Sequence, residues 1–390
     1  MNAGITRGAV PLLLVAAAAA ACAQPSAAPD RVFWTPYAQL EWGEIGHYDM
    51  QIHVHPGLGA EQYAPHETID RYHAEGFRIL AFTPHDYDVP DDHIESLYPW
   101  TRLAEIYETI KDVVNPTEDD QTYAEFAGGP YENRDPVALG MVSVDGSEIS
   151  GPHHMNSLFT SFTTGASTER ETIEQIEELG GIAFFNHPGR YIERWGLTAH
   201  WYVDLYKRHD TMIGQSIYNR IDSHPGDRAF FDQVAHILGP DRPIWLYGED
   251  DMHSENTLGW NRNVILLKDF EPGSLHPDIQ DGSAPDVKRA LIQGEFYFWK
   301  PSAQYNPRAF NLVGVKVEDR AITLVVDLPE KVTEVRWRTH DPETEETVTF
   351  HRGFDLSMGD VPGGSVFVRA ELQGEEGTIY TQPVYLRSPT

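Results

Sequence analysis

Gln51-Ile52-His53-Val54-His55 is the segment around which the other motifs of this chain are arranged. The run at residues 45–52 is strand-like, and Pro56-Gly57 ends it. Side chains on an extended backbone alternate in direction, so His53 and His55 point to the same side and can reach one ion. Histidines at the point where a strand opens into a loop are typical of metal ligands in barrel enzymes. Taken alone, the pair fits ordinary surface histidines equally well.

Several other predicted strands also end in a histidine or a carboxylate. From residue 32 onward, short apolar strands alternate with amphipathic helices, a pattern typical of an α/β fold with parallel strands. The strand-end motifs are Thr83-Pro84-His85-Asp86, Asp145-Gly146-Ser147-Glu148, Asn186-His187-Pro188 and Glu249-Asp250-Asp251-Met252-His253. In a closed α/β barrel the carboxyl ends of the strands meet at one face, so these residues would converge. A doubly wound open sheet is the alternative, and it would spread them along a line.

The spacing of apolar residues predicts where the elements lie. Predicted strands lie at residues 77–82, 141–144, 182–185 and 244–247. Predicted helices lie at residues 65–75, 99–114 and 168–179, the last opened by a capping box of Thr168 and Glu171. The polar, acidic stretch at residues 115–135 is predicted to be a loop over one end of the fold.

From about residue 307 the pattern changes to short alternating strands with Pro/Gly turns between them. The alternating apolar pairs include Val315/Val317, Ile322/Leu324, Val335/Trp337, Val348/Phe350, Val366/Val368 and Val384/Leu386. About seven short strands at this spacing predict a small β-sandwich of immunoglobulin type. We therefore predict a barrel domain at residues 33–306 and a structural or adhesive sandwich at residues 307–390.

The N-terminal segment has the composition of an export signal. Arg7 precedes an apolar run at residues 9–21, which is too short to span a bilayer as a helix. We predict a signal peptide at residues 1–22 and a linker at residues 23–32. Ala19-Ala20-Ala21-Cys22 resembles a lipobox, which would attach the protein to a membrane through lipidated Cys22, but cleavage before Gln24 fits as well. The expected location is periplasmic, either free or as a membrane-anchored lipoprotein.

The charge and cysteine content restrict the partners and the ligands. With 29 Lys and Arg against 60 Asp and Glu, the formal charge is −31. Such a surface repels nucleic-acid phosphates, so we expect no nucleic-acid partner. Any anionic substrate would need a local attraction, which divalent ions supply. Because Cys22 is the only cysteine, a metal site must use nitrogen and oxygen ligands.

Taken together, the motifs resemble those of PHP-domain (polymerase and histidinol phosphatase) metallohydrolases over about residues 44–300. In family order they are Ile52-His53-Val54-His55, Thr83-Pro84-His85-Asp86, Gly146-Ser147-Glu148-Ile149, His154-Met155-Asn156, Gly180-Gly181 with Asn186-His187-Pro188, and Asp251-Met252-His253. The C-terminal segment Thr381-Gln382-Pro383-Val384-Tyr385-Leu386 is similar to exported members of the carbaryl-hydrolase-like branch.

This resemblance implies a distorted (β/α)7 barrel that holds two or three divalent transition-metal ions, either zinc, manganese or iron. The implied ligands are His53, His55, Glu148 and Asp251 for one ion, the bridging Glu148 with His154 and His187 for a second, and His85 with His253 for a third. His154 is preferred to His153 because Met155-Asn156 follows it as in the family.

The sequence departs from the family pattern at three positions. Gln51 and Pro84 stand where the family usually has aspartate. A ligand in the loop after the first motif falls on Ala60, and only the neighbouring Glu61 could replace it. These departures bear most on the ion assigned to His85 and His253.

Other residues are candidates for the chemistry itself. Arg190, three residues after His187, suits an anionic ester group. Asp251, His253 or His224 could transfer protons, although His224 could equally cap a loop. Tyr218-Asn219 resembles a strand-end pair that supports the ligands in the family.

The sequence therefore predicts an exported, metal-dependent hydrolase of a small-molecule ester, with phosphoester hydrolysis as the first choice. Cleavage of a carbamate or carboxylic ester on the same site is the alternative. A non-catalytic surface module that uses the fold to bind carbohydrate or another partner is the rival from a different class. The sequence leaves the oligomeric state open.

Overall fold

The computed structural model describes residues 31–57, 63–85, 99–110, 130–151, 153–160, 168–275, 285–318 and 320–388. Outside these residues lie the predicted signal peptide with Cys22, residues 23–30 of the predicted linker, Ala60, Glu61 and most of the predicted loop at residues 115–135. Among the helices that the described ranges contain, none combines the length and the apolar composition needed to cross a membrane.

The described residues form a mixed α/β fold built on one large sheet, which contains 16 strands within these ranges. Its main path runs through β1 (Val32–Trp34), β19 (Val384–Arg387), β17 (Phe367–Gly374), β18 (Gly377–Tyr380), β11 (Phe296–Pro301), β9 (Arg262–Leu267), β2 (Gly46–Gln51), β3 (Ile79–Phe82), β4 (Val142–Ile149), β5 (Met155–Leu158), β6 (Ile182–Phe185), β7 (Met212–Asn219) and β8 (Trp245–Glu249). Off this path, β10 (Gly273–Ser274) pairs with β4, and β14 (Val332–Asp341) pairs with β17 and β15 (Glu346–Arg352). A separate sheet contains β12 (Leu312–Glu318), β13 (Ala321–Val326) and β16 (Asp355–Ser357).

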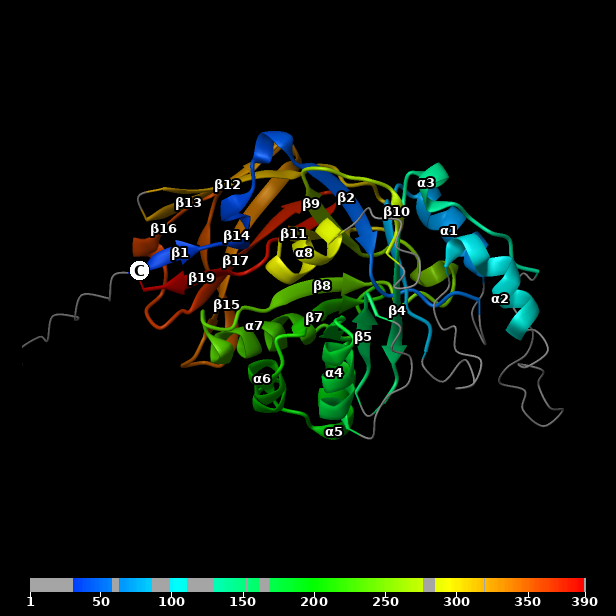
Figure 1. Cartoon of the computed structure of the whole chain (residues 1–390). Helices are drawn as coiled ribbons and strands as arrows, with labels where there is room; N and C mark the ends of the chain where they lie inside the picture. The colour runs from blue at the N-terminus through cyan, green and yellow to red at the C-terminus, as the bar shows by residue number, and fades with distance from the viewer. Residues whose placement is uncertain are drawn as a thin grey trace, which may run out of the picture.

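Helices cover the part of the sheet that carries the motifs (Figure 1). The α-helices are α1 (Pro65–Ala74), α2 (Leu103–Ile110), α3 (Pro136–Leu139), α4 (Glu169–Glu178), α5 (Pro188–Trp195), α6 (Ala199–Arg208), α7 (Asp227–Leu238) and α8 (Pro285–Gln293). Short 3-10 helices lie at Pro36–Gln39, Trp42–Glu44, Trp100–Arg102, Glu255–Thr257, Pro329–Lys331 and Met358–Asp360. Figure 1 shows α1, α2 and α3 at one end of the molecule and the C-terminal strands at the other.

The predicted elements around the motifs are confirmed. The helix that begins after Thr168 is α4, and the Thr168 side chain accepts a hydrogen bond from the backbone N–H of Glu171. The strand expected at residues 182–185 is β6. β4 is longer than the predicted strand at residues 141–144, because its second half pairs antiparallel with β5, where Glu148 lies opposite Asn156. Glu148 is therefore a strand residue instead of the first residue of a loop.

The closed barrel stays a prediction, because no ladder between β8 and β9 or β11 is found in the described part of the chain. The strands nevertheless touch. The Asn263 side chain of β9 donates to the carbonyl of Gly248 at 2.7 Å and accepts from its N–H at 3.0 Å. A Cβ on Gly248 would lie 2.0 Å from the ring of Phe298 in β11, so only glycine permits this approach.

The C-terminal strands continue the main sheet across the predicted domain border. β18 pairs antiparallel with β11, and β19 pairs with β1 near the start of the described chain. One hydrophobic core lies between this part of the sheet and the three-stranded sheet, and it includes Val264, Trp299, Leu312, Ile322 and Trp337. The expected strands are present, whereas the separate β-sandwich stays a prediction.

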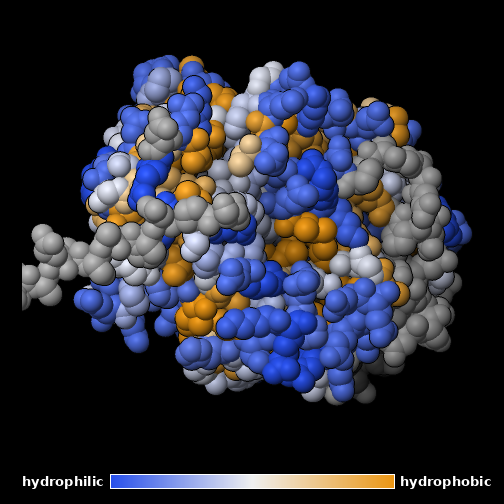
Figure 2. All heavy atoms as spheres, turned by 60° about the vertical axis from the view of Figure 1, so that its left-hand side comes forward, coloured by the Kyte–Doolittle hydropathy of each residue, from blue (hydrophilic) through white to orange (hydrophobic). Residues whose placement is uncertain are grey.

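One face of the molecule can be compared with the acidic composition of the chain. Figure 2 shows a largely hydrophilic face, on which hydrophobic residues occur in separate patches. This agrees with the formal charge of −31.

Candidate metal centre

Two extended segments bring four of the predicted ligands together. The loop after β2 and the loop after β8 meet in a parallel bridge between Val54 and Met252. Its backbone hydrogen bond joins the His55 N–H to the Met252 carbonyl at 3.1 Å. His53 and His55 flank one bridge residue, and Asp251 and His253 flank the other. Asp251 has a φ of 45°, a backbone conformation that L-residues seldom adopt and that occurs at functional sites.

The side chains of His53, His55, Asp251 and Glu148 are spaced as ligands of one ion would be. The Nε2 atoms of His53 and His55 lie 3.0 Å apart, and Asp251 Oδ1 lies 3.7 Å and 3.2 Å from them, respectively. Glu148 Oε1 is 3.4 Å from His53 Nε2, and Glu148 Oε2 is 3.5 Å from His55 Nε2. Tetrahedral ligands at about 2.0–2.2 Å from an ion lie roughly 3.3–3.6 Å from one another. This donor set therefore fits a divalent transition metal.

Glu148 lies at the centre of the cluster, buried with 1% of its surface exposed. Besides His53 and His55, three further histidines approach its two oxygens. They are His154, with Nδ1 2.8 Å from Oε1, His187, with Nε2 3.3 Å from Oε1, and His85, with Nδ1 2.9 Å from Oε2. Oε1 thus faces His53, His154 and His187, whereas Oε2 faces His55 and His85, so both oxygens have imidazole nitrogens within reach.

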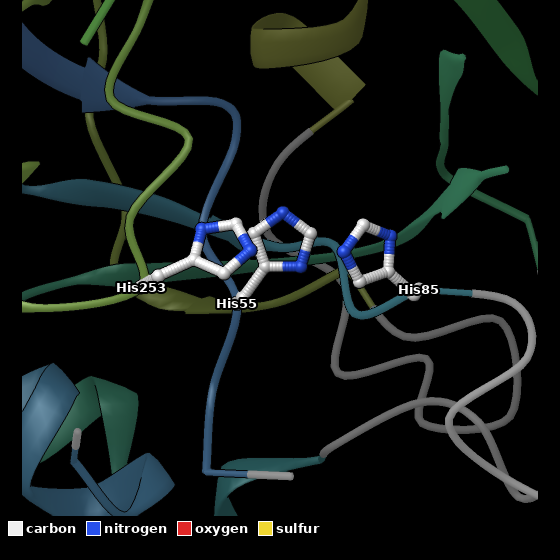
Figure 3. A group of neighbouring side chains, drawn as sticks. All are labelled: His55, His85 and His253. Atoms are coloured by element: carbon white, nitrogen blue, oxygen red, sulfur yellow. The ribbon is translucent and has the colours of Figure 1, made fainter. Parts of the chain in front are cut away.

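A second face of the cluster consists of His55, His85 and His253, which come from three different segments (Figure 3). The ring of His55 lies between the other two, with ring centroids 4.3 Å from His85 and 4.2 Å from His253. One nitrogen of each ring can be chosen so that all three lie within 4.8 Å of one another. Burial, together with His253 and His85, lowers the pKa of His55 well below its ordinary value. Its imidazole is therefore neutral, the form that binds metals.

Burial and neighbouring charges shift the pKa values of His53 and Glu148 in opposite directions. Burial lowers the pKa of His53, but the carboxylates of Glu148, Glu249 and Asp251 outweigh it and raise that pKa well above its ordinary value. Burial raises the pKa of Glu148, but His53 and His154 outweigh it and hold that pKa well below the usual range. The raised pKa of His53 favours a proton on its ring when no ion is present, so binding of an ion there would release that proton.

His153 and His154 have different surroundings. His154 faces Glu148, whereas the Nε2 atom of His153 is hydrogen-bonded to the Tyr202 hydroxyl at 2.7 Å. His153 also stacks on Tyr191, with ring centroids 3.9 Å apart. His153 is therefore part of the aromatic packing behind the cluster.

Arg190 and His224 lie outside the cluster. Arg190 is exposed on α5, and its guanidinium lies over the ring of Tyr191 at 5.8 Å. The ring of His224 is 6.5 Å from that of His187, and its Nδ1 atom is 3.8 Å from a carboxylate oxygen of Glu193. His224 thus lies near the edge of the cluster without contacting Glu148.

Arg220 is a residue that sequence reasoning missed. Its Nε atom donates to Asp251 Oδ2 at 3.0 Å, and its Nη2 atom lies 3.5 Å from His253 Nδ1. The side chain is 41% exposed, so it reaches both the cluster and the solvent. Its position directly after Tyr218-Asn219 at the end of β7 was the available signal.

Three buried residues that support the ligands were also missed. Asn186 donates to Glu148 Oε1 at 3.0 Å and to Asn156 Oδ1 at 2.9 Å. Glu249 Oε2 lies 3.0 Å from His53 Nδ1. Asn186 and Asn156 lie within two residues of a predicted ligand, and Glu249 lies near the end of a predicted strand. The sequence therefore indicated where these residues lie, but it did not indicate their contacts.

Comparison with known proteins finds likeness in shape alone. No protein-family model matches the chain, and no curated protein matches it. A two-domain protein from Bacteroides vulgatus ATCC 8482, described as containing a predicted PHP-like metal-dependent phosphoesterase, is 15% identical over 89% of each chain, with a TM-score of 0.47. The lesion-specific endonuclease PfuEndoQ from Pyrococcus furiosus is 13% identical over 63% of this chain and 56% of its own, with a TM-score of 0.33. A candidate metal-dependent phosphoesterase from Bifidobacterium adolescentis ATCC 15703 is 12% identical over 63% of this chain and 96% of its own, with a TM-score of 0.33.

Proposed function

We propose that this protein is a metal-dependent hydrolase that acts on a small-molecule phosphate ester. The observation that carries the proposal is the position of Glu148, a buried carboxylate whose two oxygens face five histidines from four segments of the chain. A structural role alone does not require so many imidazoles around one carboxylate. Imidazole and carboxylate together are the ligands that zinc, manganese and iron accept.

The residues are proposed to hold two or three ions. His53, His55, Asp251 and Glu148 would hold one, and Glu148 with His154 and His187 a second. His55, His85 and His253 form the candidate for a third. Bound there, such ions supply Lewis-acid activation of water and of the ester.

The chain's own residues would orient the substrate and transfer protons. Arg220 lies at the solvent edge of the cluster, where its guanidinium could bind the non-bridging oxygens of a phosphate. Asp251 Oδ2 accepts from Arg220 and from Asn219 Nδ2 at 3.1 Å, which leaves Oδ1 directed at His55. His253 is 28% exposed, so it is the ligand candidate best placed to pass a proton to solvent.

Hydrolysis of a carbamate or carboxylic ester remains the second candidate, since the same donor set would activate water against a carbonyl carbon. Arg220 favours the phosphate ester, because a neutral ester makes no demand for a cation at this position.

The test combines metal content with an ester panel. Protein purified without chelator should contain two or three transition-metal ions per chain by elemental analysis, and it should hydrolyse p-nitrophenyl phosphate faster than matched carboxylic and carbamate esters. Glu148→Gln is the inactive control. One ion or none, or no turnover of any ester with added manganese or zinc, would reject the proposal and favour the binding module.

A further inference from the structure

Glu249 is a buried carboxylate to which the proposed chemistry gives no role. It is the last residue of β8, two residues before Asp251, and it has no exposed surface. Its two oxygens point to two different predicted ligands. Oε2 lies 3.0 Å from Nδ1 of His53, and Oε1 accepts a hydrogen bond from the backbone N–H of His187 at 2.9 Å.

The contact with His53 fixes the role of each ring nitrogen. A carboxylate only accepts hydrogen bonds, so it keeps a proton on Nδ1 and makes Nε2 the nitrogen that can bind an ion. Nε2 is the atom that faces His55 and Glu148. The Nδ1 atoms of His55 and His187 are buried and have no hydrogen-bond partner among the described residues, so the carboxylate serves His53 specifically.

The other oxygen stabilises a strained backbone. His187 has a φ of 29°, and its N–H is shared between Glu249 Oε1 and the Ser216 hydroxyl, the latter at 2.7 Å. Ser216 in turn donates to Glu249 Oε1 at 2.8 Å. Asn219 Nδ2 reaches the same oxygen at 3.2 Å. A residue in such a conformation stays there only when its surroundings fix it, and Glu249 is the centre of those contacts.

We infer that Glu249 is a positioning residue that orients His53 through its ring and His187 through its backbone. One carboxylate thereby controls metal affinity at both of the ion positions that Glu148 bridges. Oε1 accepts from His187, Ser216 and Asn219, and Oε2 lies beside His53, so both oxygens of Glu249 are engaged with groups that support the ligands. The inference rests on the proposed function, because it requires that His53 and His187 bind metal.

The test measures zinc affinity of the full chain by competition with a chromophoric chelator. Glu249→Gln keeps the size of the side chain but presents an amide, which can also donate to Nδ1 and so favours the wrong tautomer of His53. We expect affinity at two sites to fall by about 10- to 100-fold, the usual effect of losing a partner of a ligand. Glu295→Gln is the matched control, since Glu295 is also buried but pairs with Arg289. Its zinc affinity should stay unchanged.

A double-mutant cycle separates positioning from a general loss of structure. In the His53→Ala background, Glu249→Gln should reduce affinity less than it does in the wild-type chain, because the ring contact is already absent. Nitrogen-15 NMR of the zinc-loaded wild-type protein should show the His53 proton on Nδ1, and this signal should change in Glu249→Gln. If Glu249→Gln does not fold, Ser216→Ala removes one support of the His187 N–H and should weaken zinc binding by a smaller factor.

The outcomes separate the two ideas. A wild-type chain that binds no zinc overturns both the proposed function and the role of Glu249. A wild-type chain that binds zinc, with equal affinity in Glu249→Gln or with equal losses in both backgrounds of the cycle, overturns the positioning role and leaves the proposed function standing.

Discussion

Gln51 illustrates how one side chain orders the backbone that carries the ligands. Its Nε2 atom donates to the Asn261 carbonyl at 2.9 Å. Its Oε1 atom accepts from the backbone N–H groups of Ile52 at 2.9 Å, His53 at 3.2 Å and Asp250 at 3.2 Å. An amide can donate and accept at once, whereas a carboxylate only accepts. The glutamine that departs from the family pattern therefore holds the loop after β2 against the loop after β8.

Glu148 and His85 should differ in their effects on metal content. Glu148 faces both sets of histidines, so Glu148→Gln should remove or weaken two ions together. His85 is a proposed ligand of one ion only, so His85→Ala should affect one ion. Elemental analysis of the two purified variants against the wild-type protein checks this. Equal losses in both variants would contradict the bridging position of Glu148.

Arg220 and Arg190 form a matched pair for the substrate. Because Arg220 contacts Asp251 and Arg190 is exposed on α5, Arg220→Ala should lower kcat/KM for a phosphate ester by about 10- to 100-fold, and Arg190→Ala should change it little. Turnover of a neutral ester should respond weakly to both changes. Steady-state kinetics on both substrates decide between them. A larger loss from Arg190→Ala would restore that residue as the anion-binding group.

Isolated β-bridges between loops and strands set the spacing of the ligands. The bridge between Val54 and Met252 aligns two loops, and a bridge between His85 and Glu148 aligns the loop after β3 with β4. In that bridge the Glu148 N–H donates to the Pro84 carbonyl at 2.9 Å. Proline lacks an N–H but keeps its carbonyl, so Pro84 meets this requirement.

Lys300, near the end of β11, gives a prediction of stability against pH. Its Nζ atom donates to the carbonyls of Arg220 and Trp260, each at 3.2 Å, and no ion pair to it is found in the described ranges. Burial lowers the pKa of Lys300 from its ordinary 10.5 to about 8. Between these values the unfolded chain binds more protons than the folded chain, so the lysine's contribution to stability increases as the pH rises.

Lys300→Met removes the titrating amine, so the difference between the wild-type protein and this variant isolates the contribution of Lys300. The free energy of unfolding of the wild-type protein, minus that of Lys300→Met, should increase between about pH 8 and pH 10.5 and stay level below pH 8. Urea unfolding at a series of pH values measures the difference. A difference that stays constant over the whole pH range would show that folding does not lower the pKa of Lys300.

Many of the helices and strands around the site could be predicted from the sequence, because local patterns of side chains determine them. Periodicity located α4 and β6, and the alternation of extended side chains placed His53 and His55 on one side. The contacts of Glu249 and Arg220 could not be predicted, because they depend on the register between β7 and β8, which lies in no local pattern. The pairing of β18 with β11 could not be predicted for the same reason. The change to short alternating strands at about residue 307 indicated a separate domain instead.

For the whole molecule, a buried ion pair joins the helical part to the C-terminal strands. Arg369 of β17 is 1% exposed and bonds both oxygens of Asp232 in α7, at 2.7 and 2.8 Å. Arg369→Met should lower the free energy of unfolding by about 3–5 kcal/mol, because it leaves the buried Asp232 without its charged partner, although the Thr347 hydroxyl still donates to it. Arg352→Met is the control, since Arg352 is 62% exposed, and it should change stability by less than about 0.5 kcal/mol. Denaturant unfolding compares them, and equal effects would contradict the argument.

Export and anchoring of the whole molecule remain proposals that rest on residues 1–22. If Cys22 is lipidated, mass spectrometry of the mature protein should find its N-terminus at Cys22 with the added mass of a lipid. The protein should then sediment with membranes. A mature chain that begins at Gln24 and stays in the soluble fraction would exclude the anchor.

The pairing of β1 with β19 has a consequence for synthesis. Val32 lies opposite Arg387, so β1 finds its partner only after the residues between the two strands have been made. Until then β1 is unpaired, and the edge of β11 that β18 will cover is open to other chains. Contacts so distant in sequence form slowly, and unfinished chains with open edges aggregate. Until β18 and β19 have been made, these open edges therefore expose the nascent chain to aggregation.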